Sequence, residues 1–376
     1  QVKSLSAGFE AWKAVTDAMA ECGNVEAELD QEFRKKQAQA FSADPSLYDI
    51  GGVANSTIVP LLTKDLIRPL DDLVAEYGDQ LSPNQLIKFN GQTMAIAMMV
   101  NDQHLMYRAD VLDELDIEVP ETWEEVLAAA DQIEQADVVD YPLGATMKTG
   151  WNLGEEFVNM YLGHGGEFFG EGNQPTVNND TGVAALEMMA RITDYTDPEF
   201  LVSDSTYVQQ QFQQGKIAMA NLWASRGAAM NNPDESDVVG LVESAPAPKP
   251  DADAPRPAST LWWDGFVIAD NISDEKAEAA FRVAMEGVDE EMVQANNDAA
   301  VWLVDGYEPT EMAKGAIATA EAGAAPYPAS SQMGLMHTAL GNNLAAYFTG
   351  DATPEEALAS VEQAYRNAAS EAGLTE

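Results

Sequence analysis

Five tryptophans are the side chains whose type and position point most directly to chemistry. They fall in or beside predicted loops at strand ends, and they are Trp12, Trp151, Trp223, Trp262 and Trp263. An indole ring offers a broad apolar face and one N–H donor, which suits it both to core packing and to stacking on a ligand. Their place after strands favours ligand contact, whereas Trp123 and Trp302 fall in predicted helical settings.

Polar side chains stand beside these rings or where predicted strands break. A cluster follows the apolar run 94–100, and it consists of Asp102, Gln103 and His104. Asp264 directly follows Trp263, and a carboxylate beside an aromatic ring is suited to accept two charge-assisted hydrogen bonds. The remaining candidates are turn residues or surface charges unless they touch a ligand, and they are Asn55, Ser56, Lys148 and Arg226.

Catalytic patterns are scarce. With three histidines and one cysteine, none at ligand spacing, the sequence predicts no zinc site and no cofactor. The glycine-rich stretch 163–172 lacks the Lys-Ser/Thr pair of a phosphate-binding loop, and no nucleophile elbow is present. A carboxylate pair for glycoside hydrolysis stays open as an alternative, because acids are abundant throughout the chain.

The stretch 89–108 decides how the elements are organised. Asn90-Gly91 predicts a turn, because both residues tolerate positive φ. A buried strand over 94–100 is then interrupted by the polar cluster 101–104 and resumes at 105–107. Two interpretations remain open: the chain crosses from one lobe into another, or it forms a β-hairpin with a polar tip.

Strands and helices alternate before and after this stretch. Strands are expected at 1–7, 25–29 and 48–53, and helices at 9–22 and 32–40. This alternation is typical of a parallel sheet covered by helices, in which ligands gather at the carboxyl ends of strands. Thr122 and Glu125 have the spacing of a capping box at the start of a helix. The run 261–269 is expected to be a second crossing strand, and 274–376 is expected to be mostly helical.

Length and charge set broader limits. A chain of 376 residues predicts two domains. The 63 acidic and 19 basic residues give a formal net charge of -44, which argues against nucleic-acid partners and predicts a solvated acidic surface suited to salty water. No stretch has the ~20 apolar residues that would span a bilayer. No signal peptide is seen, so a mature or trimmed form is expected, and Cys22 alone excludes an internal disulfide.

Several short motifs occur in order along the chain. They are Phe89-Asn90-Gly91, Met106-Tyr107-Arg108, Pro120-Glu121-Thr122-Trp123, Phe212 with Gly215-Lys216 and Ala218-Met219, and Gly350 with Thr353-Pro354-Glu355-Glu356. In this order they resemble the extracellular (periplasmic) solute-binding proteins of ABC importers, carbohydrate-binding family 1. Each motif alone is weak, but together they extend over nearly the whole length.

The resemblance implies an α/β, two-lobed periplasmic-binding-protein fold. Each lobe would be a mostly parallel sheet flanked by helices, with hinge crossings and a helical C-terminal region. We expect lobe 1 to comprise 1–104 and 265–308, and lobe 2 to comprise 105–264 and 309–376.

The implied function is that of a receptor, not an enzyme. A small neutral solute (a sugar, oligosaccharide or polyol) would be captured between the lobes by hinge closure. The thirteen ligand candidates named above would supply stacking faces and hydrogen bonds. The protein would be a periplasmic or extracellular monomer whose partner is the membrane permease of its importer. The alternative ligand is a quaternary ammonium solute held by tryptophans through cation–π contacts.

Overall fold

The computed structural model describes residues 1–30 and 32–374. The chain divides into two compact units, each of which is made of two segments. Unit 1 contains Gln1–Asn101 and Trp262–Pro309, and unit 2 contains Asp102–Leu261 and Thr310–Glu376. The expected boundaries lie three residues later at the first two crossings and one residue earlier at the third.

Unit 1 is built on a mixed sheet with the strand order β11-β5-β10-β3-β1-β2. β4 pairs with the first residues of β5, from Gln92 to Ile96. The strands are β1 (Val2–Ser6), β2 (Val25–Leu29), β3 (Ile50–Ala54), β4 (Leu86–Phe89), β5 (Gln92–Asn101), β10 (Thr260–Ile268) and β11 (Val301–Trp302). β5 is almost wholly buried, which explains its continuous apolar sequence rather than an alternating one.

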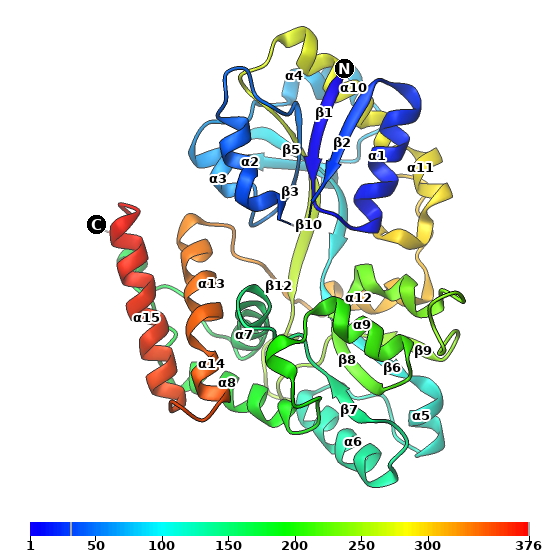
Figure 1. The fold of residues 1–376 in the computed structure, drawn as a ribbon, viewed down its shortest axis with the longest axis vertical. Coiled ribbons are helices and arrows are strands. Elements are labelled where there is room, and N and C mark those ends of the chain that lie inside the picture. The colour runs from blue at the N-terminus through cyan, green and yellow to red at the C-terminus, as the bar shows by residue number, and fades with distance from the viewer. Residues whose placement is uncertain (31, 375–376) are drawn as a thin grey trace. The chain divides into compact units, whose positions relative to one another are not determined.

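Helices pack around this sheet and complete the core of unit 1 (Figure 1). They are α1 (Glu10–Cys22), α2 (Phe33–Phe41), α3 (Val59–Thr63), α4 (Asp71–Tyr77), α10 (Asp274–Gly287) and α11 (Glu290–Ala295). α1 buries Trp12, Val15 and Met19 at helical spacing, because one stripe of an amphipathic helix must face the core.

Unit 2 has a four-stranded sheet with the order β7-β8-β6-β9. Its strands are β6 (Gln103–Arg108), β7 (Tyr141–Gly144), β8 (Ile217–Trp223) and β9 (Val242–Ala245), and the short β12 (Ala325–Pro326) pairs with the first residues of β10. Its helices are α5 (Ala109–Glu114), α6 (Trp123–Ala136), α7 (Trp151–Gly163), α8 (Asp180–Thr193), α9 (Ser205–Gln213), α12 (Glu311–Glu321), α13 (Ser331–Asn343), α14 (Ala345–Phe348) and α15 (Pro354–Glu371). The helical C-terminal region is therefore largely confirmed from α12 onward.

The α/β class is confirmed, but the sheets are mixed rather than mostly parallel. In unit 1 β1 runs parallel to β2 and β3, whereas β10 runs antiparallel to β3 and β5. In unit 2 β7 and β8 are parallel, while β6 runs antiparallel to β8 and β9. The cause is that β5, β6 and β10 belong to chain crossings, so their direction is set by the route of the chain and not by a βαβ repeat.

The stretch 89–108 is a crossing. β5 pairs within the unit 1 sheet and β6 within the unit 2 sheet, so the two strands do not form the hairpin that was the alternative. The turn at its start is confirmed, with φ of 50° at Asn90 and 81° at Gly91 between β4 and β5. The capping box is also present: Thr122 accepts from the Glu125 amide, and the Glu125 carboxylate accepts from the Thr122 amide.

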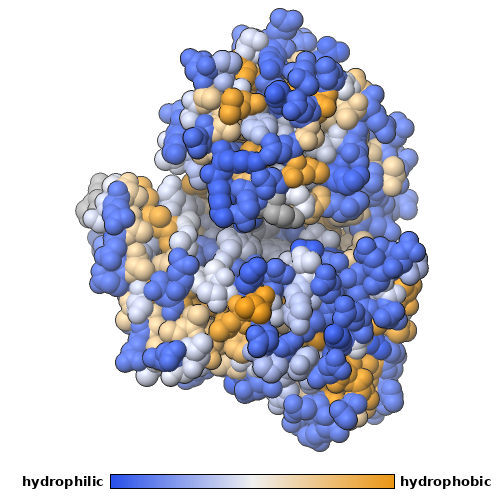
Figure 2. Space-filling view, in the orientation of Figure 1, coloured by the Kyte–Doolittle hydropathy of each residue, from blue (hydrophilic) through white to orange (hydrophobic). Residues whose placement is uncertain are grey.

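Hydrophilic side chains cover most of the face in view, with small apolar patches between them (Figure 2). This distribution agrees with the acidic, solvated surface expected from the composition. Among the described residues no helix combines the length and the hydropathy that crossing a membrane requires.

Candidate functional site

Three strand ends meet at one edge of the unit 2 sheet. β7 and β8 run parallel, so their carboxyl ends lie on the same side, and antiparallel β6 begins there. Trp223 is the last residue of β8 and pairs with Gln103, the first residue of β6. The segment after β7 leads to Trp151, which begins α7 and was expected in a loop. The fold therefore brings Trp151 and Trp223 to the same edge.

Trp151, Trp223 and His337 form an aromatic cluster at this edge. The ring centroids of Trp151 and Trp223 are 6.3 Å apart, with planes inclined by 31°. The His337 ring stacks on Trp151 at 4.9 Å and 21°. Both indoles are partly exposed, whereas His337 is buried. The cluster thus combines a fixed inner ring with two outer rings that solvent reaches.

His337 fixes the position of Trp151 through hydrogen bonds. Its Nε2 lies 2.9 Å from the Trp151 carbonyl oxygen, and Nδ1 lies 2.7 Å from the Tyr327 hydroxyl. A carbonyl only accepts, so Nε2 carries the proton and, in the neutral ring, Nδ1 accepts from Tyr327. Both ring nitrogens are therefore engaged, and the backbone at the start of α7 is tied to α13.

Two glycines allow this close approach of α7 and α13. Gly150 has φ of 104°, which side-chain-bearing residues rarely adopt, and its amide donates to Gly341 O at 3.0 Å. A Cβ at Gly154 would lie 2.7 Å from the His337 ring. A larger residue at Gly154 would displace the His337 ring on which Trp151 stacks, and one at Gly150 would strain the backbone.

Lys148 and Arg226 lie at the start of α9. Lys148 Nζ is 3.4 Å from the Asp204 carboxylate, the N-cap of α9. Arg226 donates to Ser205, Thr206 and Gln209. Burial lowers the pKa of Arg226, and the nearby Asp204 carboxylate opposes that shift. These two candidates, which are close in sequence to Trp151 and Trp223, therefore already have protein partners on α9 and its N-cap.

The polar cluster at the first crossing does not present free side chains. Asp102, which precedes β6, is 4% exposed. Gln103 and His104 begin β6, a central strand of the unit 2 sheet, and are 1% and 0% exposed. Burial holds the pKa of Asp102 well above its usual value and lowers the pKa of His104 to about 4. The side chains are buried as the structure describes them, and their contact with a ligand stays a prediction.

Glu156 is a residue that the sequence reasoning missed. Burial raises the pKa of its carboxyl to about 7, although hydrogen bonds from Thr146 and Gln103 favour the ionised form. It lies on α7, one turn and a half after Trp151. Gln103, which was predicted to contact a ligand, therefore hydrogen-bonds to this carboxylate.

In unit 1 a second group of candidates gathers where β3 ends. Asp264 pairs with Ala54 across the sheet, so it lies beside Asn55 and Ser56, which follow β3. Asn55 is buried, while Ser56 and Asp264 are partly exposed. Burial raises the pKa of Asp264 to about 7, and the Arg34 guanidinium opposes this rise. Arg34 belongs to α2, and no sequence pattern indicated that its charge acts on Asp264.

The unit 1 tryptophans differ in exposure. Trp12 is 1% exposed and packs in the core against Gly52, where a Cβ would lie 2.8 Å from its ring. Trp262 is 6% exposed within central β10. Only Trp263 is partly exposed, and it packs on the edge of the unit 1 core. The placement of Trp12 and Trp262 matches core packing, because a helix face and a central strand are covered on all sides.

Among the described residues no three His, Cys, Asp or Glu side chains are grouped so as to hold a metal ion. His337 is, after Glu156, a second residue for which sequence reasoning predicted no role. It contacts Trp151, which lies 186 positions away in the chain. No local sequence signal reports such a contact.

Comparison with known proteins bears on both units. The family model of the bacterial extracellular solute-binding proteins matches residues 3–288. An Agrobacterium radiobacter K84 ABC transporter solute-binding protein in complex with ribitol superposes with a TM-score of 0.83 at 19% identity, covering 97% of this chain and 98% of that one. The maltose-bound T. maritima MalE3 has a TM-score of 0.83 at 19% identity, covering 98% and 100%. An Agrobacterium vitis S4 solute-binding protein with bound D-mannitol has a TM-score of 0.81 at 19% identity, covering 99% of each chain.

Proposed function

The chain belongs to the bacterial extracellular solute-binding proteins, and from this we propose that it is the receptor of an ABC importer for a sugar, oligosaccharide or polyol. The family is one of transport proteins rather than enzymes, and its name gives an extracellular location. The proposed ligand is small, neutral and rich in hydroxyl groups.

The aromatic cluster of unit 2 is the observation that carries this proposal. Trp151 and Trp223 are partly exposed at the carboxyl edge of the sheet, 6.3 Å apart, with His337 behind one of them. Aromatic faces of this kind pack on the C–H face of a sugar ring, which removes apolar surface from water without leaving a hydroxyl unpaired. Lys148 and Arg226 flank the rings and offer N–H donors to hydroxyl oxygens.

Unit 1 supplies the acceptors in the proposed mechanism. Asp264, Asn55 and Ser56 lie together after β3, and a carboxylate accepts from hydroxyl groups more strongly than a neutral amide does. Binding would draw the two units together by rotation at the three chain crossings. The receptor would act as a monomer, and its partner would be the membrane permease of the importer.

Ligand-bound relatives support the ligand class. The similar structures named above hold ribitol, maltose and D-mannitol. A quaternary ammonium ligand is the alternative, since tryptophan faces also attract cations. An ammonium cage needs several rings around one point, whereas two of the five candidate tryptophans, Trp12 and Trp262, are buried in unit 1.

A thermal-shift screen with calorimetric follow-up tests the proposal. Sugars, oligosaccharides, polyols and betaines would be compared side by side with the same protein. We expect a sugar or polyol to raise the melting temperature in a concentration-dependent way, because a ligand that binds only the folded state stabilises it. Stabilisation by a betaine and by no carbohydrate would overturn the ligand class. Release of reducing ends from an oligosaccharide would instead support the glycoside-active alternative.

A further inference from the structure

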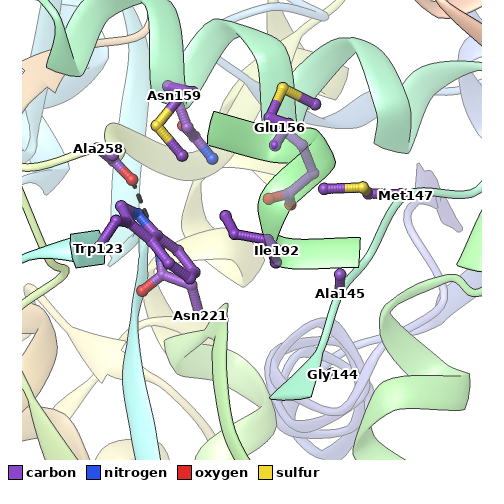
Figure 3. A pocket seen from close by; sticks show the side chains of 11 residues that line it. Trp123, Gly144, Ala145, Met147, Glu156, Asn159, Ile192, Asn221 and Ala258 are labelled. Atoms are coloured by element: carbon purple, nitrogen blue, oxygen red, sulfur yellow. Dashed lines mark hydrogen bonds between the residues drawn. The ribbon is translucent and has the colours of Figure 1, made fainter. Parts of the chain in front are cut away.

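Unit 2 contains a small interior cavity of about 20 Å³ (Figure 3). Its wall is formed by residues of α6, α7, α8, β8 and the segment after β7, among them Trp123, Met147, Glu156, Asn159, Ile192 and Asn221. Ligand pockets usually occupy ~300–1,000 Å³, whereas ~10–15 Å³ is enough for one water. The cavity is therefore distinct from any site that holds a sugar.

Within the described part of the chain, three polar atoms in its wall are buried without a hydrogen-bond partner. They are Trp123 Nε1, Asn159 Nδ2 and Asn221 Oδ1. Their residues are 6%, 3% and 5% exposed, so bulk water does not solvate them. Such groups are rarely left unpaired in folded proteins, and three around one small cavity indicate a shared partner.

The opposite ends of the two amides fix which atom faces the cavity. The Thr260 hydroxyl oxygen lies 2.8 Å from Asn159 Oδ1 and 2.7 Å from Glu155 Oε1, and its one proton can be donated to only one of them. The Oδ1 end of Asn159 therefore faces Thr260, and Nδ2 is the end left unpaired. Asn221 Nδ2 donates to Ala258 O at 3.3 Å, which leaves its Oδ1 as the free acceptor. The cavity is thus lined by two N–H donors and one carbonyl acceptor, and the carboxyl of Glu156 is the fourth polar group.

This set of groups selects the ligand by its hydrogen-bonding capacity. A water molecule accepts two hydrogen bonds and donates two, which matches two N–H donors, an amide oxygen and a carboxylate oxygen. A metal ion would face the N–H groups of Trp123 and Asn159, which carry no lone pair for it. An anion would face the oxygens of Asn221 and Glu156.

We propose that a single buried water molecule is an integral part of unit 2, bound by Trp123, Asn159, Asn221 and Glu156. It links α6 and α7 to β8. Where the proposed function holds, this link also matters for the ligand, because α7 begins at Trp151 and β8 ends at Trp223. The bound water then fixes the spacing of the two elements that carry the stacking rings.

Nuclear magnetic resonance on the ligand-free protein tests the proposal without assuming any solute. The chain has seven tryptophans, so ¹⁵N-tryptophan labelling gives few indole signals, and Trp123→Phe identifies the one of interest. We expect a nuclear Overhauser cross-peak between the Trp123 indole proton and water. Its sign should be that of a water molecule that stays bound while the protein tumbles. Asn221→Leu should abolish it, whereas Asn178→Leu, a change at an exposed asparagine, should leave it intact.

A wild-type crystal structure at high resolution is the second measurement, and it does not depend on whether a variant folds. The expected result is one water within ~2.7–3.2 Å of Trp123 Nε1, Asn159 Nδ2 and Asn221 Oδ1. Absence of the cross-peak in the wild-type protein would overturn the proposal, as would its persistence in a folded Asn221→Leu variant. A metal ion at the position, or no density there, would overturn it equally. None of these results bears on which solute the protein carries.

Discussion

The rings of Trp151 and Trp223 lie 6.3 Å apart and are inclined by 31°, although 71 residues separate them in sequence. The parallel pairing of β7 with β8 brings them together, since one indole follows the first strand and the other ends the second. This pair is the most specific element of the candidate site, and it can be tested by single substitutions.

Trp223→Ala should weaken ligand binding by ~2–4 kcal/mol, the usual loss when an aromatic residue at the centre of an interface is truncated. The melting temperature of the ligand-free protein should change little, because the indole is only partly buried. The matched control is Trp12→Ala in the unit 1 core, which should instead cost ~3–5 kcal/mol of folding free energy. Calorimetry and thermal melts separate the two effects; unchanged affinity of the Trp223 variant would remove this residue from the site.

Asp264→Asn should act on affinity and on stability in opposite directions. Loss of the charge weakens hydrogen bonds from ligand hydroxyls, so affinity near pH 8 should fall by ~1–2 kcal/mol. The pKa of Asp264 is about 7 when folded and ~3.9 when unfolded, so keeping its charge buried destabilises the folded state increasingly as the pH rises through this window. The ligand-free variant should therefore melt at a higher temperature than the wild type near pH 8. Asp270→Asn, at an exposed position of the same unit, should change neither quantity.

Glu156→Gln gives a pH-dependent change in the stability of unit 2. The folded-state pKa of Glu156, about 7, exceeds that of the unfolded chain, ~4.3, so the wild-type protein loses stability as the pH rises between these values. The glutamine variant avoids this loss and should be more stable by roughly 1–3 kcal/mol near pH 8, with the difference vanishing near pH 4. Unfolding curves across this range provide the measurement. Glu118→Gln, at an exposed acid, should show no such trend; a constant difference for Glu156→Gln would contradict the assignment.

Salt should stabilise the protein strongly. With 63 acidic and 19 basic residues, repulsion between carboxylates opposes the compact state. Raising sodium chloride from ~0.1 M to ~1 M shortens the screening length from ~10 Å to ~3 Å, so the melting temperature should rise. The same increment near pH 4, where many carboxylates are neutral, should raise it much less. An equal rise at both pH values would attribute the effect to salt exclusion rather than to screening.

Ligand binding should reduce the radius of gyration if capture occurs by hinge closure. Small-angle X-ray scattering with and without the solute found in the screen is the direct measurement. Trp223→Ala at the same solute concentration serves as the control, because it should bind less and compact less. A saturated protein whose scattering curve does not change would contradict closure while leaving the ligand assignment intact.

Local patterns accounted for most elements of the fold. Helical spacing located α1, and the Thr122–Glu125 pair located the start of α6, because capping is decided within one turn. Strand order was not accessible in this way. β10 lies between β5 and β3 because the chain returns from unit 2, and no residue within β10 encodes its neighbours.

The candidate site was accessible from sequence only where a strand end is followed by an aromatic residue. Trp223 satisfied this rule and lies at the sheet edge. Asp102 and His104 also lie beside a strand end, yet they are buried, because the start of the central strand β6 is covered whether its side chains are polar or apolar. The contact between His337 and Trp151 arises from helix packing between distant segments, which sequence periodicity does not report.

The position of β10 also has a consequence for the order in which the protein folds. β5 and β3 are its neighbours in the finished sheet, yet residues 102–261, the first segment of unit 2, are synthesised between β5 and the unit 1 part of β10. Until β10 arrives, one edge of β5 and one edge of β3 lack their partner, and such edges readily pair with other chains. Unit 2 in turn is incomplete until residues 310–376 have been synthesised. A ribosome-bound fragment that stops before residue 260 should therefore be aggregation-prone, and acquisition of protease resistance should begin only once β10 has emerged.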